Sequence, residues 1–489
     1  MESLTSEACY RAIQTRDARF DGKLFVGVTS TGIYCRPVCP ARTPKFEHCR
    51  FFVSAPAAQV AGFRPCLRCR PETAPEVASW RGTSNTVSRA LALIAEGALD
   101  GEENVSALAA RLGVGERQLR RLFGKHLGAS PLAVAQTRRV LFAKQLLHET
   151  QLPVTQVALA AGFGSVRRFN ETFQALFGRS PSALRRKSQR SDAEVPITLF
   201  LRYRPPYEWD TMLAYLAARA IAGVECVERG AYRRTAIVDG VCGTVEVANA
   251  PGRNSLQVTV RVSGVRALPA IVARVRRAFD LHADITSIGS HLARDPSLAP
   301  LVAQRPGLRA PGAWNGFELA VRAVLSQQIT VEAARRLASK LVVICGTPLP
   351  AESRHDPRLT SVFPSADCLA NADLTTLGMP TPRRAALQAL ARAALAEPQL
   401  LDSHGTQKDV LARLRSIPGI GAWTAEYIAL RAWREPDAFP ASDVGLLRGA
   451  AGLMGVRPTP AGLLDRAELW RPWRAYAAQH LWAAEAVHG

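Results

Sequence analysis

The sequence predicts a multidomain protein in which a small α+β domain, an all-α domain, a second α+β domain and a mostly α-helical domain follow one another. Three observations predict this fold class. The chain has 489 residues, more than one domain usually holds. Most of its ten cysteines lie before residue 78, so that region differs in kind from the rest. The hydrophobic pattern then changes from a helical period to strand character and back to a helical period.

Changes in composition give the expected domain limits. They divide the chain into residues 1–78, 84–188, 196–285 and 286–489. Two stretches read as linkers because they are rich in proline or in polar and charged residues, namely 71–79 and 185–192. In the third part, β-branched and alternating residues predict strands at 197–201 and 256–262, interleaved with helices near 209–221 and 268–280.

The overall composition excludes several classes of protein. A hydrophobic content of 47% is sufficient for packed cores and excludes a disordered chain. No apolar run reaches the length of a membrane span, and residues 1–7 lack a signal-peptide pattern, so we expect a cytoplasmic protein without a membrane partner. The net charge of +21, most of it within residues 1–190, is typical of a nucleoid-associated, nucleic-acid-binding protein. A generally arginine-rich proteome would produce the same charge.

Four cysteines form two close pairs set among glycine, proline and arginine, Cys35-x-x-x-Cys39 and Cys66-x-x-Cys69. In a cytoplasmic protein, cysteines more often bind metal or react than form disulfides. Two thiol pairs at this spacing suit a tetrahedral zinc ion, so we expect Cys35, Cys39, Cys66 and Cys69 to bind one zinc. Zinc would also keep the thiols deprotonated and nucleophilic at neutral pH. The alternative is a set of ordinary, partly buried cysteines.

This segment, over residues 8–75, resembles the N-terminal zinc domain of Ada-type DNA repair proteins. The resemblance implies that Cys35 also accepts a methyl group from a methylphosphotriester in the DNA backbone. Arg36 is a neighbouring residue suited to phosphate, and the resemblance places near DNA Thr31, Arg42, Arg64 and Arg68. Methylation would remove about one of the two negative charges of a four-thiolate zinc centre. We hypothesise that DNA affinity then rises about tenfold or more, so that repair becomes a transcriptional signal.

Residues 105–113 repeat 49 residues later as 154–162. In each copy an apolar-faced helix leads through a glycine turn into a basic helix, as in a helix-turn-helix unit that enters the major groove. The expected DNA-contacting side chains are Arg117, Arg120, Arg167 and Arg168. A helical bundle with a solvated basic face is the alternative. The string 160–181 resembles the DNA-binding domain of AraC-type activators, which implies a sequence-specific activator with RNA polymerase as a further partner.

The C-terminal part contains a glycine-rich string followed by an aspartate, Ile417-Pro418-Gly419-Ile420-Gly421 and then Asp443. Its glycines let the backbone approach a DNA phosphate, and the following helix would point free N–H groups at that phosphate. The string resembles the hairpin of helix-hairpin-helix DNA glycosylases, in which such an aspartate is catalytic. The resemblance implies DNA contacts from Pro418, Gly419 and Gly421 and a monovalent-cation site at the hairpin carbonyls. Without the hairpin, Asp443 would be read as an ordinary helix N-cap.

Residues 196–489 as a whole resemble the AlkA-type 3-methyladenine DNA glycosylases, through the strings 317–330 and 470–482 as well as the hairpin. The resemblance implies that a flipped-out base binds between Trp423, Tyr427 and Trp482. It also makes Gln328 the wedge that fills the vacated stack, where some members carry an apolar side chain. Tryptophans at helical spacing are otherwise more typical of a protein core.

Two further features define the expected reaction. Glycosylases that also cut the strand use a lysine where this chain has Trp423, so we expect a monofunctional enzyme that uses water. No cysteine follows Cys368, so we expect no iron–sulfur cluster. Methylated purines are cationic and leave easily, and aromatic faces attract cations by about 0.5–2 kcal/mol each.

The sequence therefore predicts a bifunctional alkylation-damage protein. A zinc-thiolate methylphosphotriester acceptor and an AraC-type activator precede an AlkA-type glycosylase, and double-stranded DNA, both damaged and promoter, is the expected partner. One alternative is a damage-sensing transcription factor with a catalytically silent glycosylase-like half. Another is a glycosylase whose N-terminal modules only tether it to DNA.

Overall fold

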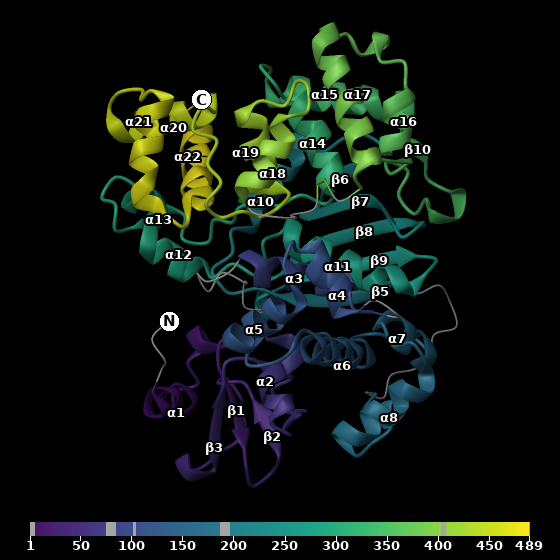
Figure 1. Ribbon diagram of the computed structural model, residues 1–489, viewed down its shortest axis with the longest axis vertical. Helices are drawn as coiled ribbons and strands as arrows, with labels where there is room; N and C mark the ends of the chain where they lie inside the picture. The colour runs from purple at the N-terminus through teal and green to yellow at the C-terminus, as the bar shows by residue number, and fades with distance from the viewer. Residues whose placement is uncertain are drawn as a thin grey trace. The chain divides into compact units, whose positions relative to one another are not determined.

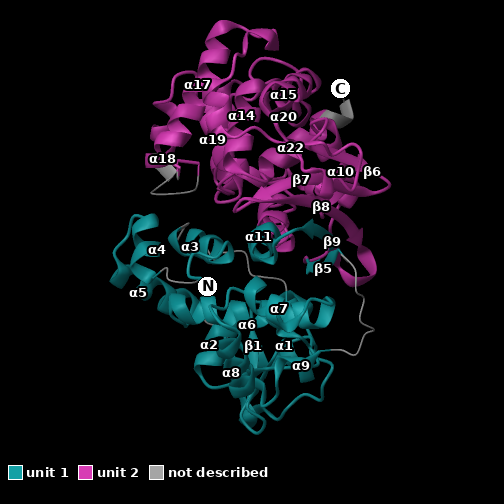
Figure 2. Ribbon diagram, turned by 90° about the vertical axis from the view of Figure 1, so that its right-hand side faces the viewer, with its two compact units in different colours: residues 1–202, 257–273 teal, residues 203–256, 274–489 magenta. Residues whose placement is uncertain are grey.

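The computed structural model describes residues 5–74, 85–100, 104–185, 196–398, 400–401 and 407–488. The chain forms two compact units, shown in different colours in Figure 2. Unit 1 comprises residues 1–202 and 257–273, and unit 2 comprises residues 203–256 and 274–489. Among the described helices, none combines the length and apolarity needed to cross a bilayer.

Unit 1 begins with helix α1 (Ser6–Gln14) and a four-stranded sheet in the order β3-β1-β2-β4 (Figure 1). Its strands are β1 (Phe25–Val28), β2 (Ile33–Cys35), β3 (Cys49–Phe52) and β4 (Arg64–Pro65), and helix α2 (Ala55–Val60) lies between β3 and β4 in the chain. β1 is antiparallel to β2 and β3, whereas β2 and β4 are parallel, with Tyr34 opposite Pro65. Because parallel strands run in one direction, the residues that follow β2 and β4 leave the sheet at the same edge.

The prediction of a linker at 71–79 is wrong for residues 71–73. Pro71–Thr73 forms a 3₁₀ turn in which all three residues are buried. The turn is held because the Glu72 carboxylate accepts a hydrogen bond from Lys144 Nζ at 2.8 Å, a contact that local composition cannot reveal. Residues 75–79 lie outside the described part, as do residues 186–192 of the second expected linker.

The next seven helices of unit 1 contain the repeat found in the sequence. They are α3 (Asn85–Ala95), α4 (Val105–Arg111), α5 (Glu116–Leu127), α6 (Pro131–Glu149), α7 (Val154–Ala160), α8 (Val166–Phe177) and α9 (Pro181–Leu184). The turns α4–α5 and α7–α8 contain Gly113 and Gly162, with φ of 68° and 80° that favour glycine. α8 packs through Phe169, Phe173 and Phe177, one helical turn apart. Both expected helix-turn-helix units are therefore present.

Unit 1 also contains two neighbouring strands, β5 (Ile197–Arg202) and most of β9 (Ser255–Val262). β5 alternates strictly between buried and half-buried residues, which is the period of a strand with one face on a core. The helices expected to be interleaved with these strands along the chain are α10 (Trp209–Arg219), in unit 2, and α11 (Leu268–Ala278), which begins in unit 1. The strand and helix predictions for this part of the chain are confirmed.

Unit 2 contains an antiparallel meander of three strands, β6 (Glu225–Glu228), β7 (Ala231–Val238) and β8 (Val241–Ala250). Two-residue turns join them, Arg229-Gly230 and Asp239-Gly240. All four of these residues have positive φ, as a type I′ hairpin requires. These three strands are not among those predicted from the sequence.

The rest of unit 2 is helical, as expected for residues 286–489 apart from a small two-stranded sheet, β10 (Thr347–Pro348) and β11 (Ser361–Val362). The described helices are α12 (Ile285–Leu292), α13 (Ala299–Gln304), α14 (Gly316–Leu325), α15 (Val331–Cys345), α16 (Ala366–Asn371), α17 (Thr381–Ala396), α18 (Gln407–Arg415), α19 (Ala422–Arg431), α20 (Val444–Met454), α21 (Pro460–Ala467) and α22 (Arg474–His488). One core joins α14, α15, α17 and α19 through fully buried residues such as Val324, Leu341, Leu387 and Ile428.

Candidate functional site

The four predicted metal ligands meet at one point of unit 1. Cys35 ends β2 and Cys66 follows β4, so the parallel pairing of these strands brings the two cysteine pairs together. The Sγ atoms of Cys35, Cys39, Cys66 and Cys69 all lie within 4.8 Å of one another. A tetrahedral zinc–thiolate site places its sulfurs about 3.8 Å apart, so the cluster is of the right size.

The chemistry around the sulfurs also fits zinc. The backbone N–H groups of Arg36 and Arg68 donate to Cys69 Sγ and Cys66 Sγ, both at 3.4 Å, as thiolates require. Hydrogen bonds among the four thiols lower the pKa of Cys39 and Cys66 but raise the pKa of Cys35 and Cys69. Four thiols so close cannot all ionise without a cation between them, and zinc supplies that charge.

The basic residues of this region divide into two groups. Arg36 is 4% exposed, donates from Nε to Asp21 Oδ1 at 2.7 Å and from Nη1 to Cys69 O at 3.0 Å. The expectation that Arg36 contacts phosphate is therefore wrong, because its charge is buried and paired. Thr31, Arg42 and Arg68 are exposed and Arg64 is half-buried, so these residues remain available to DNA.

A buried lysine ties the metal-binding loop to the helical region of unit 1. Lys144, on α6, is fully buried; its Nζ donates to Cys66 O at 3.0 Å and to Glu72 Oε2 at 2.8 Å. Arg70 joins the same network, bonding Glu72 Oε1 and Glu149 Oε1 at 3.1 Å each. α6 lies between the two helix-turn-helix units in the chain, so the metal-binding loop and the helical repeat share one polar core.

The predicted recognition helices α5 and α8 present basic side chains to solvent. Arg117, Arg120, Arg167 and Arg168 are all exposed. Arg120 pairs with Glu116 and Arg167 with Glu171, each one helical turn away. Exposed pairs of this kind are weak, so both arginines can exchange a carboxylate for a phosphate.

Asp443 lies between two indole rings in unit 2. It is the N-cap of α20, and its Oδ1 accepts from Leu446 N at 3.0 Å. Oδ1 also accepts from Trp482 Nε1, and Oδ2 from Trp423 Nε1, both at 2.8 Å. An ordinary N-cap needs only the backbone bond, so the two indoles give the carboxylate a second, side-chain environment.

Close packing of helices produces this arrangement. A Cβ on Gly449 of α20 would lie 2.2 Å from Leu481 O of α22, so only glycine lets the two helices approach this closely. A Cβ on Gly445 would lie 3.1 Å from the Trp482 ring. The indole therefore fits directly beside the first turn of α20, where Asp443 stands.

The three predicted pocket aromatics form one cluster. Trp423 and Tyr427 stack with centroids 5.3 Å apart, and Tyr427 meets Trp482 edge to face at 6.3 Å. All three are half-buried. The buried guanidinium of Arg431 lies 5.6 Å from the Tyr427 ring and 4.9 Å from the Trp482 ring. Both indole N–H groups donate to Asp443, so the aromatic cluster surrounds a charged group.

The glycine-rich hairpin joins α18 to α19 and lies open to solvent. Pro418, Gly419 and Gly421 are exposed, and Gly419 has a φ of +84°. A Cβ on Gly419 would lie 2.3 Å from the Ala386 Cβ, so glycine is required there for space as well as for conformation. The first turn of α19 has no side-chain cap, so its N–H groups are available to a phosphate.

Two adjacent glutamines follow helix α14, and the first of them bonds to this hairpin. Gln327 Nε2 donates to Gly419 O and to Thr424 Oγ1, both at 3.0 Å. Gln328 is exposed and has a φ of +58°, a left-handed conformation that few side chains adopt. The expected wedge residue is therefore exposed and lies at a left-handed bend of the backbone.

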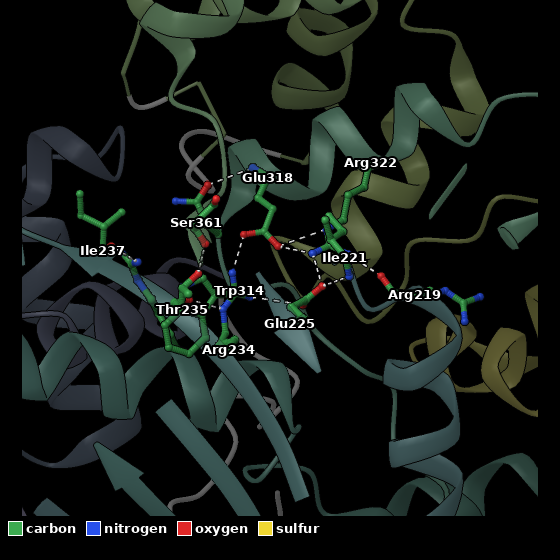
Figure 3. Close-up of polar contacts among 12 residues, drawn as sticks. Arg219, Ile221, Glu225, Arg234, Thr235, Ile237, Trp314, Glu318, Arg322 and Ser361 are labelled. Carbon is green, nitrogen blue, oxygen red and sulfur yellow. Dashed lines mark hydrogen bonds and ion pairs between the residues drawn. The ribbon is translucent and has the colours of Figure 1, made fainter. Parts of the chain in front are cut away.

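A buried charge cluster joins α14 to the sheet of unit 2 (Figure 3). Arg234 Nη2 bonds Glu318 Oε2 at 2.7 Å, and Arg322 Nη2 bonds Glu318 Oε1 and Glu225 Oε2 at 2.6 Å each. Burial alone would raise the pKa of Glu318, but the two arginines lower it to about 2. Arg322 Nη1 also donates to Arg219 O at 3.0 Å, which connects α14 to the end of α10.

Several residues of the site were not identified from the sequence. Tyr215 of α10 brings its hydroxyl to 3.5 Å from the Tyr427 hydroxyl, and Arg431 lies behind the aromatic rings. Tyr215 and Tyr427 are 212 positions apart, so no spacing signal connects them. Arg431 follows Tyr427 by one helical turn on α19 and could have been found from that spacing. Gln327 could have been found, since it directly precedes the expected wedge.

Comparison with known families agrees with this geometry. Family profiles match in the order metal binding domain of Ada (residues 8–72), helix-turn-helix domain (108–187), AlkA N-terminal domain (198–315) and HhH-GPD superfamily base excision DNA repair protein (321–475). These four matches, with the four-cysteine zinc site and the hairpin, define a DNA-binding repair protein fused to a regulatory module.

Comparison with individual proteins shows which repair proteins this chain is similar to. The chain is 42% identical to the probable bifunctional transcriptional activator/DNA repair enzyme AlkA of Mycobacterium tuberculosis, over 97% of this chain and 96% of that protein. It is 35% identical to DNA-3-methyladenine glycosylase 2 of Escherichia coli, over 58% of this chain and 96% of the relative. The structure of a 3-methyladenine DNA-glycosylase from Archaeoglobus fulgidus shares the fold, with a TM-score of 0.52 and 20% identity, over 59% of this chain and 99% of that one. The chain belongs to the family of AlkA-type bifunctional transcriptional activator/DNA repair enzymes.

Proposed function

We propose that unit 2 hydrolyses the N-glycosidic bond of alkylated purines in DNA, with Asp443 as the catalytic residue. The observation that carries this proposal is the carboxylate held by two indole N–H groups at 2.8 Å each. Three donors orient the group: Oδ1 accepts two hydrogen bonds and Oδ2 accepts one among the described residues. Oδ2 therefore keeps room for a further contact.

Asp443 acts on the sugar in this proposal. Breaking the C1′–N bond leaves positive charge on the deoxyribose, which a fixed carboxylate stabilises without reorganising. Oδ2 is the oxygen that faces the sugar or orients the attacking water. Trp423 stands where strand-cutting relatives use lysine and cannot form a Schiff base, which supports a monofunctional enzyme.

The hairpin and the glutamine wedge prepare the substrate. The exposed Pro418, Gly419 and Gly421 bind the strand through backbone groups, while the exposed Gln328 enters the stack when a base leaves it. Trp423, Tyr427 and Trp482 receive the base. A monovalent cation at the hairpin carbonyls would strengthen phosphate binding. One of these carbonyls, Gly419 O, also accepts a hydrogen bond from Gln327. The cation is tested by measuring abasic-DNA affinity over a range of potassium concentrations.

Base release from methylated duplex DNA tests the glycosylase proposal. Purified protein should liberate free methylpurines and leave abasic sites that break only after alkaline treatment. Strand cleavage without alkali would contradict the monofunctional mechanism. Absence of released base would favour a catalytically silent sensor.

We also propose that Cys35 accepts a methyl group from a phosphotriester and that Thr31, Arg42, Arg64 and Arg68 bind the flanking DNA. Zinc on Cys35, Cys39, Cys66 and Cys69 would keep the acceptor sulfur deprotonated. Sulfur attacks the methyl carbon, and the phosphate oxygen leaves with the electron pair as a diester. The lost negative charge then favours promoter binding by Arg117, Arg120, Arg167 and Arg168.

Transfer of labelled methyl from a methylphosphotriester oligonucleotide tests the acceptor role. Label should appear on Cys35, and promoter affinity should rise about tenfold or more afterwards. Equal affinity before and after transfer would contradict the switch. Contact with RNA polymerase is tested separately, by promoter-dependent recruitment of the methylated protein.

The limits 1–78, 84–188, 196–285 and 286–489 remain our proposed division into domains.

A further inference from the structure

Two tyrosine hydroxyls form a pair at the edge of the Asp443 cluster. Tyr215 comes from α10 and Tyr427 from α19, and their hydroxyl oxygens lie 3.5 Å apart. Tyr427 stacks on Trp423 and meets Trp482 edge to face, and both indoles bond Asp443. The hydroxyl pair therefore belongs to the same group of side chains as the carboxylate, and the mechanism above gives it no task.

Two guanidinium groups flank the Tyr215 ring. Arg219 Cζ lies 4.0 Å and Arg431 Cζ 5.1 Å from its centroid. Arg431 is held by bonds from Nη1 to Pro311 O and from Nη2 to Gln479 Oε1, both at 3.0 Å. Fixed positive charges beside a phenol stabilise its phenolate, so they make the hydroxyl a better proton donor.

The two phenols differ in acidity as a result. Burial alone would raise the pKa of Tyr215, but Arg431, Arg219 and the Tyr427 hydroxyl outweigh it and lower the pKa to about 8. Burial and the neighbouring Tyr215 raise the pKa of Tyr427 to about 12. Tyr215 thus remains protonated at neutral pH while being the stronger acid of the pair, which is the condition for a general acid.

The charges of Arg219 and Arg431 also affect how strongly the site binds positively charged and neutral bases. Two positive charges lie close to the aromatic rings: Arg431 is near the Tyr427 and Trp482 rings, and Arg219 is near the Tyr215 ring. The cluster contains one negative charge, that of Asp443. These cations oppose the attraction of the aromatic faces for a base that is already positive. They also stabilise negative charge that develops on a neutral base as it leaves.

We propose that Tyr215 is a general acid that protonates the departing base when the lesion is a neutral purine; this rests on the proposed glycosylase function. As the C1′–N9 bond breaks, its electron pair moves into the purine, and the Tyr215 O–H proton transfers to a ring nitrogen. The base leaves neutral. Water adds to C1′ and gives up a proton through Asp443 to solvent, and the Tyr215 phenolate regains a proton from solvent. A cationic methylpurine leaves neutral without this proton.

The experiment compares one neutral and one cationic lesion in the full-length protein. Single-turnover release is measured from duplex oligonucleotides that contain hypoxanthine or 7-methylguanine, between pH 5 and 10. Tyr215→Phe keeps the ring and removes the acid, so the hypoxanthine/7-methylguanine rate ratio should fall by about 10²-fold. The wild-type hypoxanthine rate should decline above about pH 8, where the phenol ionises, and the variant should lack that decline.

Tyr203→Phe is the matched control, because the Tyr203 hydroxyl bonds Asn249 Oδ1 at 3.1 Å, outside the cluster. Its ratio should equal that of the wild type. The ratio of two rates is independent of the folded fraction, so a partly unfolded variant is still informative. An unchanged ratio in Tyr215→Phe, or wild-type release of 7-methylguanine alone, would overturn the general acid. Failure of the wild type to release either base would instead overturn the proposed glycosylase function.

Discussion

The cysteine centre of unit 1 and the aspartate site of unit 2 are built in opposite ways. The four sulfurs come from 35 consecutive residues, Cys35 to Cys69, and one small sheet brings them together. The aspartate site takes Tyr215 from α10, Trp423 from α19 and Trp482 from α22. The first site depends on local strands and a metal, whereas the second depends on the packing of distant helices.

This difference concerns where the stabilising free energy comes from. A zinc–thiolate site contributes its binding energy directly to the fold of its own domain. The geometry of the aspartate site follows instead from close contacts such as Gly449 with Leu481 and from the buried charges around Glu318. The two sites should therefore fail independently, and for different reasons.

Removal of zinc should give the largest effect and should be confined to unit 1. Structural zinc provides roughly 10–16 kcal/mol of apparent binding free energy, so chelation should unfold the region around residues 5–74. Hydrogen exchange should show lost protection there, while base release stays within about twofold. A parallel loss of base release would contradict the independence of the sites.

Breaking the buried charge cluster should be the next largest effect. Glu318→Gln leaves Arg234 partly unpaired, so the free energy of unfolding of unit 2 should fall by about 3–5 kcal/mol in urea titrations. Because folding lowers the pKa of Glu318 from 4.5 to about 2, its contribution is complete above pH 4.5 and is lost as the pH falls toward 2. Wild-type stability should therefore decline between pH 4.5 and 2 more steeply than that of the variant.

A matched control for this variant is Glu332→Gln. Glu332 pairs with Arg336 on the exposed side of α15, with both side chains about two-thirds exposed. The free energy of unfolding should change by no more than about 0.5 kcal/mol. A similar loss in both variants would mean that burial of the Glu318 pair is irrelevant to stability.

Asp443→Asn should separate chemistry from binding. The amide keeps the shape but loses the charge, and its NH2 group cannot accept the hydrogen bond that one of the indole N–H groups donates to Asp443. Base release should therefore fall by about 10²–10³-fold while abasic-DNA affinity changes little. Methyl uptake by Cys35 should be unaffected. Cys35→Ser should give the reverse pattern, with metal content measured because the thiol is also a ligand. Retained release in Asp443→Asn would remove the aspartate from the mechanism.

The smallest expected effect is that of Gln327→Ala. This change removes two hydrogen bonds that link α14 to the hairpin, each worth about 1 kcal/mol. Abasic-DNA affinity should fall by roughly tenfold or less in fluorescence anisotropy titrations. Gln388→Ala, which removes a bond to Ala372 O away from the hairpin, should leave the affinity unchanged.

The same contrast explains what the sequence could predict. The spacing of the four cysteines, the 49-residue repeat and the hairpin are local patterns, and each predicted its structure correctly. The prediction that Arg36 contacts phosphate fails because its guanidinium is buried and paired with Asp21, which lies on another segment of the chain. Glu72 was placed in a linker for the same reason, since its partner is Lys144. Tyr215 carried no local signal, because only tertiary packing brings it to Tyr427. Arg431, in contrast, follows Tyr427 by one helical turn on α19, a spacing that the sequence does show.

The contact between Lys144 and Glu72 has a consequence for how this protein can be divided. A fragment that ends at residue 74 would expose the Glu72 carboxylate and leave Cys66 O without its donor. A fragment that extends through Glu149 would keep both bonds and the Arg70 pairs as well. Gene rearrangements that carry the metal-binding loop to a new protein should thus succeed most readily when they carry α6 with it.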